Sequence, residues 1–253
     1  MHCCSAAYLS PATLALVAAL LSAGQVQAYG PTRPGWPQTA KGDPVHLTYS
    51  YENLLDGGLK DPDGVAVPAV QIRTAIEEAF GLWAAVAPLH FTEVFDDGLP
   101  YGQSQAYGTI RLRHRYINGP DPVDGPPTTK ATATFPGSIP TSGDVNFDHA
   151  DPWVLMGTYR QPDILGLAAH EIGHALGLQH TNIDGATMYW IALRHNGPGT
   201  GYLHPDDIAA IRSIYGTGIG SVTPLTAQVP EPGSFALVVC VGVCVAAQRS
   251  RRR

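Results

Sequence analysis

The chain has almost no cysteine where a folded domain would use it. Of its 253 residues only four are cysteines, and they lie near the two ends, at Cys3, Cys4, Cys240 and Cys244. If both ends are removed or embedded in a membrane, the body can form neither a disulfide nor a thiolate metal site. A secreted fold stapled by disulfides is therefore excluded, and stability must come from a hydrophobic core and from any ions that the body binds.

Basic residues are also scarce outside the last few positions. Residues 1–228 carry 11 Lys and Arg against 20 Asp and Glu, a net charge of −9, because four arginines occupy the last five positions. Affinity for nucleic acid depends first on Lys and Arg, so a nucleic-acid partner is not expected. The chain is 44% apolar and 14% charged, with little low-complexity sequence. It can build a core, which excludes a wholly disordered chain.

The N-terminal end is typical of a secretory signal peptide. Residues 14–21 form a short apolar run, and small or polar residues follow up to Val26 and Ala28. This order predicts that residues 1–28 are a signal peptide, cleaved before Tyr29, although no Lys or Arg precedes the apolar run. The alternative is a buried N-terminal helix, which Pro11 and the Ser-Ala-Gly-Gln stretch would close early.

Three features follow one another in residues 229–253. A Pro-Glu-Pro sequence at 230–232 precedes an apolar run at 235–247, and the chain ends in an arginine cluster. The run is shorter than the roughly 20 residues of a full transmembrane helix. The order resembles the PEP-CTERM sorting signal of exported bacterial proteins, which implies retention of the arginines on the cytoplasmic side of the membrane and processing by an exosortase-like enzyme.

A plain C-terminal membrane anchor that is never cleaved is the alternative for this tail. Either interpretation predicts that the body is exported. We expect it in the cell envelope, on the cell surface or outside the cell of a Gram-negative-type bacterium.

Residues 29–216 form the body, which we expect to be one domain, followed by a linker at 217–228 rich in Gly, Ser, Thr and Pro. Alternating and helical hydrophobic patterns locate its elements. Strands are predicted at 46–51, 91–95 and 109–112, and helices at 67–86, 163–178 and 205–215. Asp163 is the expected N-cap of the second helix. Strands mixed with three helices predict an α+β fold.

The strongest functional signal is a group of histidines in residues 170–180. His170 and His174 are four residues apart, so on one helix their imidazoles face the same way and can share a tetrahedral ion. His180 can reach that ion only if the chain turns back, and Gly177 can take the left-handed conformation without steric cost. Three imidazoles with one open position describe a catalytic zinc site, and Glu171 would lie close to that position.

With Met188 downstream, these residues resemble the signature of the metzincin zinc peptidases, which joins this histidine spacing to a methionine turn. Within that clan the body is similar to the matrixins, the matrix-metalloproteinase type of catalytic domain. The likeness runs from Leu47 through Trp83 and the sequence at 143–148 to Gly216. It implies a twisted mixed sheet of about five strands with three helices, and a zinc cleft between the upper and lower parts.

The resemblance also implies roles for particular residues. His170, His174 and His180 match the zinc ligands, Glu171 matches the general base, and Met188 matches the side chain beneath the metal. The positions that match the substrate-binding edge and pocket are Ala131, Thr132, Ala133, Tyr189, Trp190 and Ala192.

Three acidic residues, Asp124, Asp148 and Asp151, match positions that hold a structural calcium ion in the family, and carboxylate oxygens suit that ion. A solvated acidic loop is the alternative, because Thr129 stands near the place where a further oxygen donor is expected.

The chain departs from the family in two ways. Matrixins carry a second, structural zinc, but no His-x-Asp pair occurs between 109 and 124, and Thr132 and Asn146 occupy the two later histidine positions. We therefore expect no second structural zinc. The pro-segment of the family blocks the catalytic metal with a cysteine, which this body lacks, so latency by that route is excluded.

These observations together predict an exported, monomeric zinc-dependent endopeptidase. It would hydrolyse peptide bonds of a protein or peptide substrate through a zinc-bound water, with Glu171 as the general base. One alternative is a surface-displayed zinc-binding or structural protein with little activity, which predicts loss of the base or of a ligand. Another is a zinc hydrolase of non-peptide substrates.

Overall fold

The computed structural model describes residues 32–104, 106–120, 129–155, 163–190 and 203–225. The expected signal peptide, the C-terminal tail, Asp124 and Ala192 lie outside these residues. No helix in the described ranges is long and apolar enough to cross a membrane. In chain order the elements are β1 (Val45–Tyr51), α2 (Ala69–Ala84), β2 (Leu89–Glu93), β3 (Ile110–Arg115), β4 (Ala131–Ala133), β5 (Val145–Asp148), α3 (Ile164–Ala175), α4 (Pro205–Tyr215) and β6 (Ser221–Thr223).

One mixed sheet carries all these strands, in the order β4-β5-β3-β1-β2-β6. β4 is an edge strand and pairs antiparallel with β5, whereas every other pair is parallel. Together with the three helices this is the α+β architecture that the sequence predicts. The free side of β4 leaves one row of backbone donors and acceptors open at the edge of the sheet.

The sheet has six strands, one more than the approximate number of five that the resemblance implied. The additional strand, β6, comes from the segment expected as a linker and pairs with β2 from His90 to Thr92. Gly220 makes this pairing feasible, because a Cβ at that position would lie 1.7 Å from the carbonyl oxygen of Leu89. Three residues of Ser, Val and Thr behind a glycine are typical of a loop, so the sequence pattern did not indicate the strand.

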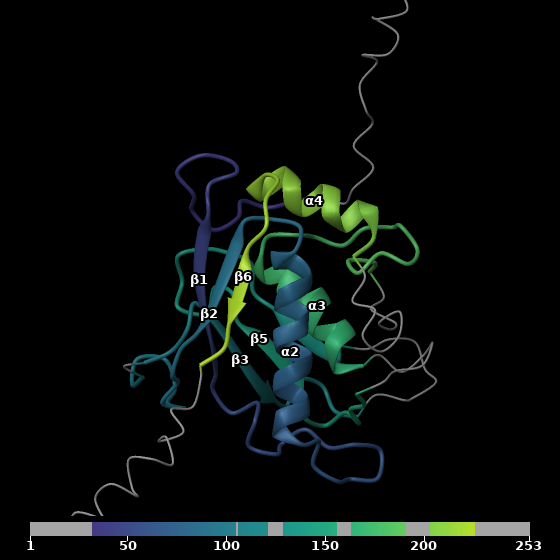
Figure 1. Ribbon diagram of the computed structural model, residues 1–253. Helices are drawn as coiled ribbons and strands as arrows, with labels where there is room; N and C mark the ends of the chain where they lie inside the picture. Colours follow the sequence, from purple (N-terminus) through teal and green to yellow (C-terminus); the bar gives the residue numbers. More distant parts are fainter. Residues whose placement is uncertain (1–31, 105, 121–128, 156–162, 191–202, 226–253) are drawn as a thin grey trace, which may run out of the picture.

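Helices α2 and α3 cover the same face of the sheet (Figure 1). Phe80 of α2 packs between Tyr49 and Phe91, with ring centroids 4.6 and 4.7 Å apart. Trp83 donates a hydrogen bond of 2.9 Å to the carbonyl oxygen of Ala169. These buried contacts fix α3, which carries the candidate site, against the sheet.

Local signals explain where the helices begin. Asp163 is the N-cap of α3, as predicted, and its carboxylate accepts a hydrogen bond of 2.6 Å from the Gly166 amide. The boundaries of α4 agree with the prediction, because Pro205 opens the helix and Gly216 follows its last residue with a φ of 83°. The helix predicted at 67–86 is shorter, since Pro68 at its N-cap is extended.

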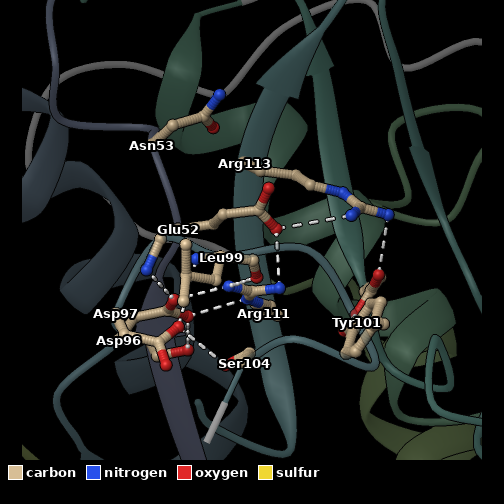
Figure 2. Close-up of polar contacts among 12 residues, drawn as sticks. Glu52, Asn53, Asp96, Asp97, Leu99, Tyr101, Ser104, Arg111 and Arg113 are labelled. Atoms are coloured by element: carbon tan, nitrogen blue, oxygen red, sulfur yellow. Dashed lines mark hydrogen bonds and ion pairs between the residues drawn. The ribbon is translucent and has the colours of Figure 1, made fainter. Parts of the chain in front are cut away.

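The opposite face of the sheet carries a buried network of charges. Figure 2 shows the guanidinium of Arg111 between Asp96 and Glu52. Arg111 donates to both carboxylate oxygens of Asp96, at 2.6 and 2.8 Å, and lies 3.0 Å from Glu52. Burial alone would raise the pKa of Asp96, but hydrogen bonds from Arg111 and Ser50 outweigh it and hold that pKa below its usual value.

This network ties the loop after β2 to the sheet. Arg111 donates to the carbonyl oxygen of Leu99, and Arg113 pairs with Asp144 at 2.8 Å. The side chain of Arg111 is fully buried and that of Asp96 is 1% exposed. Neither charge can be hydrated if its partner is lost, so the pair is far more sensitive to truncation than a surface ion pair.

We expect Arg111→Met to lower the free energy of unfolding by about 3–5 kcal/mol, because the buried carboxylate of Asp96 would lose its cationic partner, whereas Glu52 would still pair with Arg113. Urea unfolding measures the change. The matched control is Arg115→Gln, which removes an exposed arginine at the end of the same strand and should alter stability by less than about 0.5 kcal/mol. A loss of stability no larger for Arg111→Met than for the control would contradict the account.

Candidate metal centre

Three histidines meet at the end of α3. His170 and His174 are on the helix, and the Nε2 atom of each lies 3.1 Å from Nε2 of His180. The three ligand atoms all lie within 4.8 Å of one another, and within the described part of the chain this is the one such group of three or more His, Cys, Asp or Glu side chains. In a tetrahedral zinc site with bonds of 2.0–2.1 Å, neighbouring nitrogens are about 3.3 Å apart. The observed spacing therefore fits zinc.

Backbone carbonyls fix which nitrogens face the centre. Nδ1 of His170 donates to the carbonyl oxygen of Thr187, and Nδ1 of His174 donates to that of Leu178, each at 2.7 Å. Because a carbonyl oxygen can only accept, the proton of each ring is on Nδ1 and the Nε2 lone pair points inward. His180 has at most one Nε2 proton to share between two contacts, so a cation is the partner that satisfies all three nitrogens.

Burial keeps the two helical imidazoles neutral, as metal ligands must be. It lowers the pKa of His170 to about 3, helped by the neighbouring His174. It lowers the pKa of His174 to about 4. Neither ring would be charged near neutral pH, so no protonation would oppose the binding of a cation.

The chain turns back where Gly177 was predicted to turn it. Its φ is 103°, and its amide donates to the carbonyl oxygen of His174 at 2.9 Å. A Cβ at this position would lie 3.2 Å from the carbonyl oxygen of Arg33 and 3.3 Å from that of Pro34. The left-handed conformation thus favours glycine at the turn that brings His180 to the two helical histidines, and a larger residue would also be crowded there.

Met188, predicted to lie beneath the metal, packs against Gly173, the helical residue just before His174. Its side chain is 2% exposed. A Cβ on Gly173 would lie 2.3 Å from the Met188 sulfur and 3.0 Å from a carbon of Trp83. Gly173 is therefore needed because the methionine packs directly on the helix backbone.

Asp207 holds this methionine turn in place, a role that the sequence analysis missed. The fully buried carboxylate accepts hydrogen bonds from the amides of Thr187, Met188 and His204, at 2.8, 3.0 and 2.9 Å. An acidic residue at the third position of α4 signals a capping box, which is also present. No sequence pattern around Asp207 indicates that its carboxylate also binds the amide of Thr187, 20 residues earlier in the chain.

Glu171 follows His170 on α3 and is 5% exposed. Burial raises the pKa of its carboxyl to about 8. A carboxyl group with a pKa near neutrality can both take up and release a proton, which is the property of a general base that later acts as an acid.

The positions expected to bind substrate lie in two places. Ala131, Thr132 and Ala133 make up β4, the open edge of the sheet, against which α3 packs. Tyr189 and Trp190 follow the methionine turn, and Trp190 is 54% exposed. Phe135, which the sequence analysis did not single out, places its ring edge-on to His174 with centroids 5.5 Å apart.

The two described aspartates of the expected calcium site are both buried. Asp148 accepts hydrogen bonds from the amides of Asn118 and Ala150. Asp151 lies 3.4 Å from the ammonium group of Lys130. The chain therefore supplies one cation of its own beside Asp151, and calcium stays a prediction.

Thr132 and Asn146, which stand where matrixins have histidines, are cross-strand neighbours between β4 and β5. The side-chain oxygen of Asn146 accepts a hydrogen bond of 2.6 Å from Arg113. The guanidinium thus joins Asn146 to the charge network of Figure 2.

The fold and the cluster define an α+β domain with a three-histidine metal centre at the end of a helix. The matrixin family model matches residues 47–216, and the chain belongs to this family. It is 36% identical over 199 residues to an interstitial collagenase of Equus caballus, covering 78% of this chain and 36% of that protein. It is 35% identical over 185 residues to matrix metalloproteinase-C of Caenorhabditis elegans, covering 70% of this chain and 29% of that protein. It is 31% identical over 203 residues to neutrophil collagenase of Homo sapiens, covering 80% of this chain and 38% of that protein. The chain spans about a third of the length of these relatives.

We expect Gly173→Ala to destabilise the protein by about 1–3 kcal/mol and to weaken zinc binding, because the new methyl group would displace the Met188 side chain from the helix that carries His170 and His174. Gly81→Ala in α2 is the matched control. A Cβ there meets nothing within 4 Å, so alanine should stabilise that helix by up to about 1 kcal/mol. Thermal unfolding and zinc titration of both variants check this, and equal effects of the two substitutions would refute the packing role of Gly173.

Proposed function

We propose that this chain is a zinc-dependent endopeptidase. The observation that carries the proposal is the convergence of three Nε2 atoms at the helix that also carries the buried Glu171, in a chain of the matrixin family. His170, His174 and His180 would hold the ion. Three protein ligands leave one position open, as in catalytic zinc sites, whereas structural zinc sites are usually closed by four.

Glu171 is the proton carrier of the proposed reaction. When bound, zinc supplies a Lewis acid that acidifies water and polarises a carbonyl group. Glu171 accepts the proton of the attacking water and delivers it to the amine that leaves when the peptide bond breaks. The buried position that raises its pKa makes this carboxylate more basic than one in water.

The open edge of β4 is the proposed binding site for the substrate backbone. An extended peptide can add to a sheet edge through main-chain hydrogen bonds, while pockets select its side chains. Ala131, Thr132 and Ala133 would provide the edge. Tyr189, Trp190 and Ala192 would border the pocket for the residue after the scissile bond.

The ends of the chain support the proposal that the protein is exported. Residues 1–28 would be removed as a signal peptide, and residues 229–253 would be processed by an exosortase-like enzyme or would anchor the protein in the membrane. The body, at 29–216, would act as a monomer outside the cytoplasm of a bacterium.

We expect Glu171→Gln to lower kcat/KM for a fluorogenic peptide by about 100-fold or more, because amide cannot carry the proton, while zinc content stays at the wild-type level. Glu78→Gln is the control, a glutamate on α2 whose loss should leave activity unchanged. A Glu171→Gln variant with more than a tenth of wild-type kcat/KM would refute the role. Absence of peptide cleavage in the zinc-loaded wild type would instead favour a binding protein or a hydrolase of other substrates.

We expect the protein to retain one zinc ion, not two, after dialysis, because Thr132 and Asn146 cannot replace imidazole ligands. Metal analysis decides this, and two zinc ions per chain would overturn it.

Calcium, if held by Asp124, Asp148 and Asp151, should raise the melting temperature, since an ion that binds only the native state stabilises it by mass action. We expect a chelator selective for calcium to lower the melting temperature with zinc retained. Asp124→Asn should abolish this response if the carboxylate is a ligand. A melting temperature indifferent to calcium would contradict the site.

A further inference from the structure

An exposed arginine stands at the rim of the histidine cluster. The guanidinium carbon of Arg33 lies 4.4 Å from the centre of the Phe135 ring. The same ring meets His174 edge-on at 5.5 Å. A single aromatic side chain therefore separates a positive charge from a proposed zinc ligand.

The backbone holds Arg33 in this place. Its amide donates a hydrogen bond of 2.8 Å to the carbonyl oxygen of Gly177, and Thr32 forms a β-bridge with Leu178. Three residues on, the indole of Trp36 donates to the carbonyl oxygen of Ala175 at 2.9 Å. The backbone at Arg33 is thus held against the turn that brings His180 to the cluster, and stacking on Phe135 places the guanidinium beside it.

Arg33 has no acidic partner among the residues that the structure describes. By contrast, Arg73, Arg111 and Arg113 each pair with a carboxylate. Stacking on Phe135 occupies the face of the guanidinium but leaves its N–H groups at the edge, and this fork matches the two oxygens of a carboxylate.

Phe135 follows β4 by two residues, so a peptide that adds to the edge of β4 and reaches the cluster passes the Arg33 guanidinium. We infer that Arg33 is a specificity-determining residue that binds an Asp or Glu side chain of the substrate, so that acidic peptides are cleaved fastest. This inference rests on the proposed peptidase function. The chain as a whole is negative, with a formal net charge of −6, so a local cation is what an acidic substrate needs at this site.

The test compares kcat/KM across a peptide series with a neutral parent. Gln is replaced singly by Glu or by Lys at each position on both sides of the scissile bond. For the wild type we expect Glu to exceed Gln by about fivefold at one position, the effect of an exposed ion pair. The preference should fall toward one as NaCl rises from about 0.05 to 1 M, because salt screens exposed charges.

Arg33→Gln should bring the Glu to Gln ratio at that position to about one, and Arg33→Glu should favour Lys instead. The control Arg115→Gln makes the same change in net charge at the far end of β3 and should keep the wild-type ratio. The ratio of kcat/KM for the Glu and Gln peptides does not depend on the folded fraction of a variant, because both values are measured on the same sample. A wild-type ratio near one at every position, or an unchanged ratio in Arg33→Gln, would overturn the inference. No cleavage of any peptide by the wild type would instead contradict the peptidase function itself.

Discussion

Three imidazole nitrogens with inward lone pairs repel one another unless a cation lies among them. In this protein two of those lone pairs are directed inward by the carbonyl oxygens of Thr187 and Leu178, which accept the other ring proton. Nε2 of His180 is only 3.1 Å from Nε2 of His170 and from Nε2 of His174. The surrounding structure therefore has to hold together an arrangement that is unfavourable without an ion, and the turn at Gly177 serves that end.

Segments from distant parts of the chain provide this support. Tyr215 at the end of α4 donates to the carbonyl oxygen of Leu176 and accepts from the amide of Trp36, at 2.8 and 3.0 Å. Asp207 at the start of the same helix binds the methionine turn. Helix α4 thus holds both the turn after α3 and the segment at Thr187 and Met188, so a change in α4 should alter the geometry of the metal centre.

The features that could be predicted from the sequence are those that depend on residues close together in the chain. The spacing of His170 and His174, the glycine at the turn and the range of the helix at 205–215 each depend on a few neighbouring residues, and each was predicted. Asp207, Phe135 and Lys130 act through contacts made only after folding, and no pattern near them in the sequence identifies their partners. β6 was missed for a different reason, because three residues behind Gly220 are too few to show alternation.

The charge network around Arg111 and the metal centre lie on different sides of the sheet, so stability and chemistry can be altered separately. The most direct test of the central claim is to add zinc in steps to chelator-treated protein while following cleavage of a peptide. The account predicts that activity rises in proportion to zinc and stops rising at one ion per chain. Bound zinc without cleavage, or cleavage that does not depend on zinc, would contradict it.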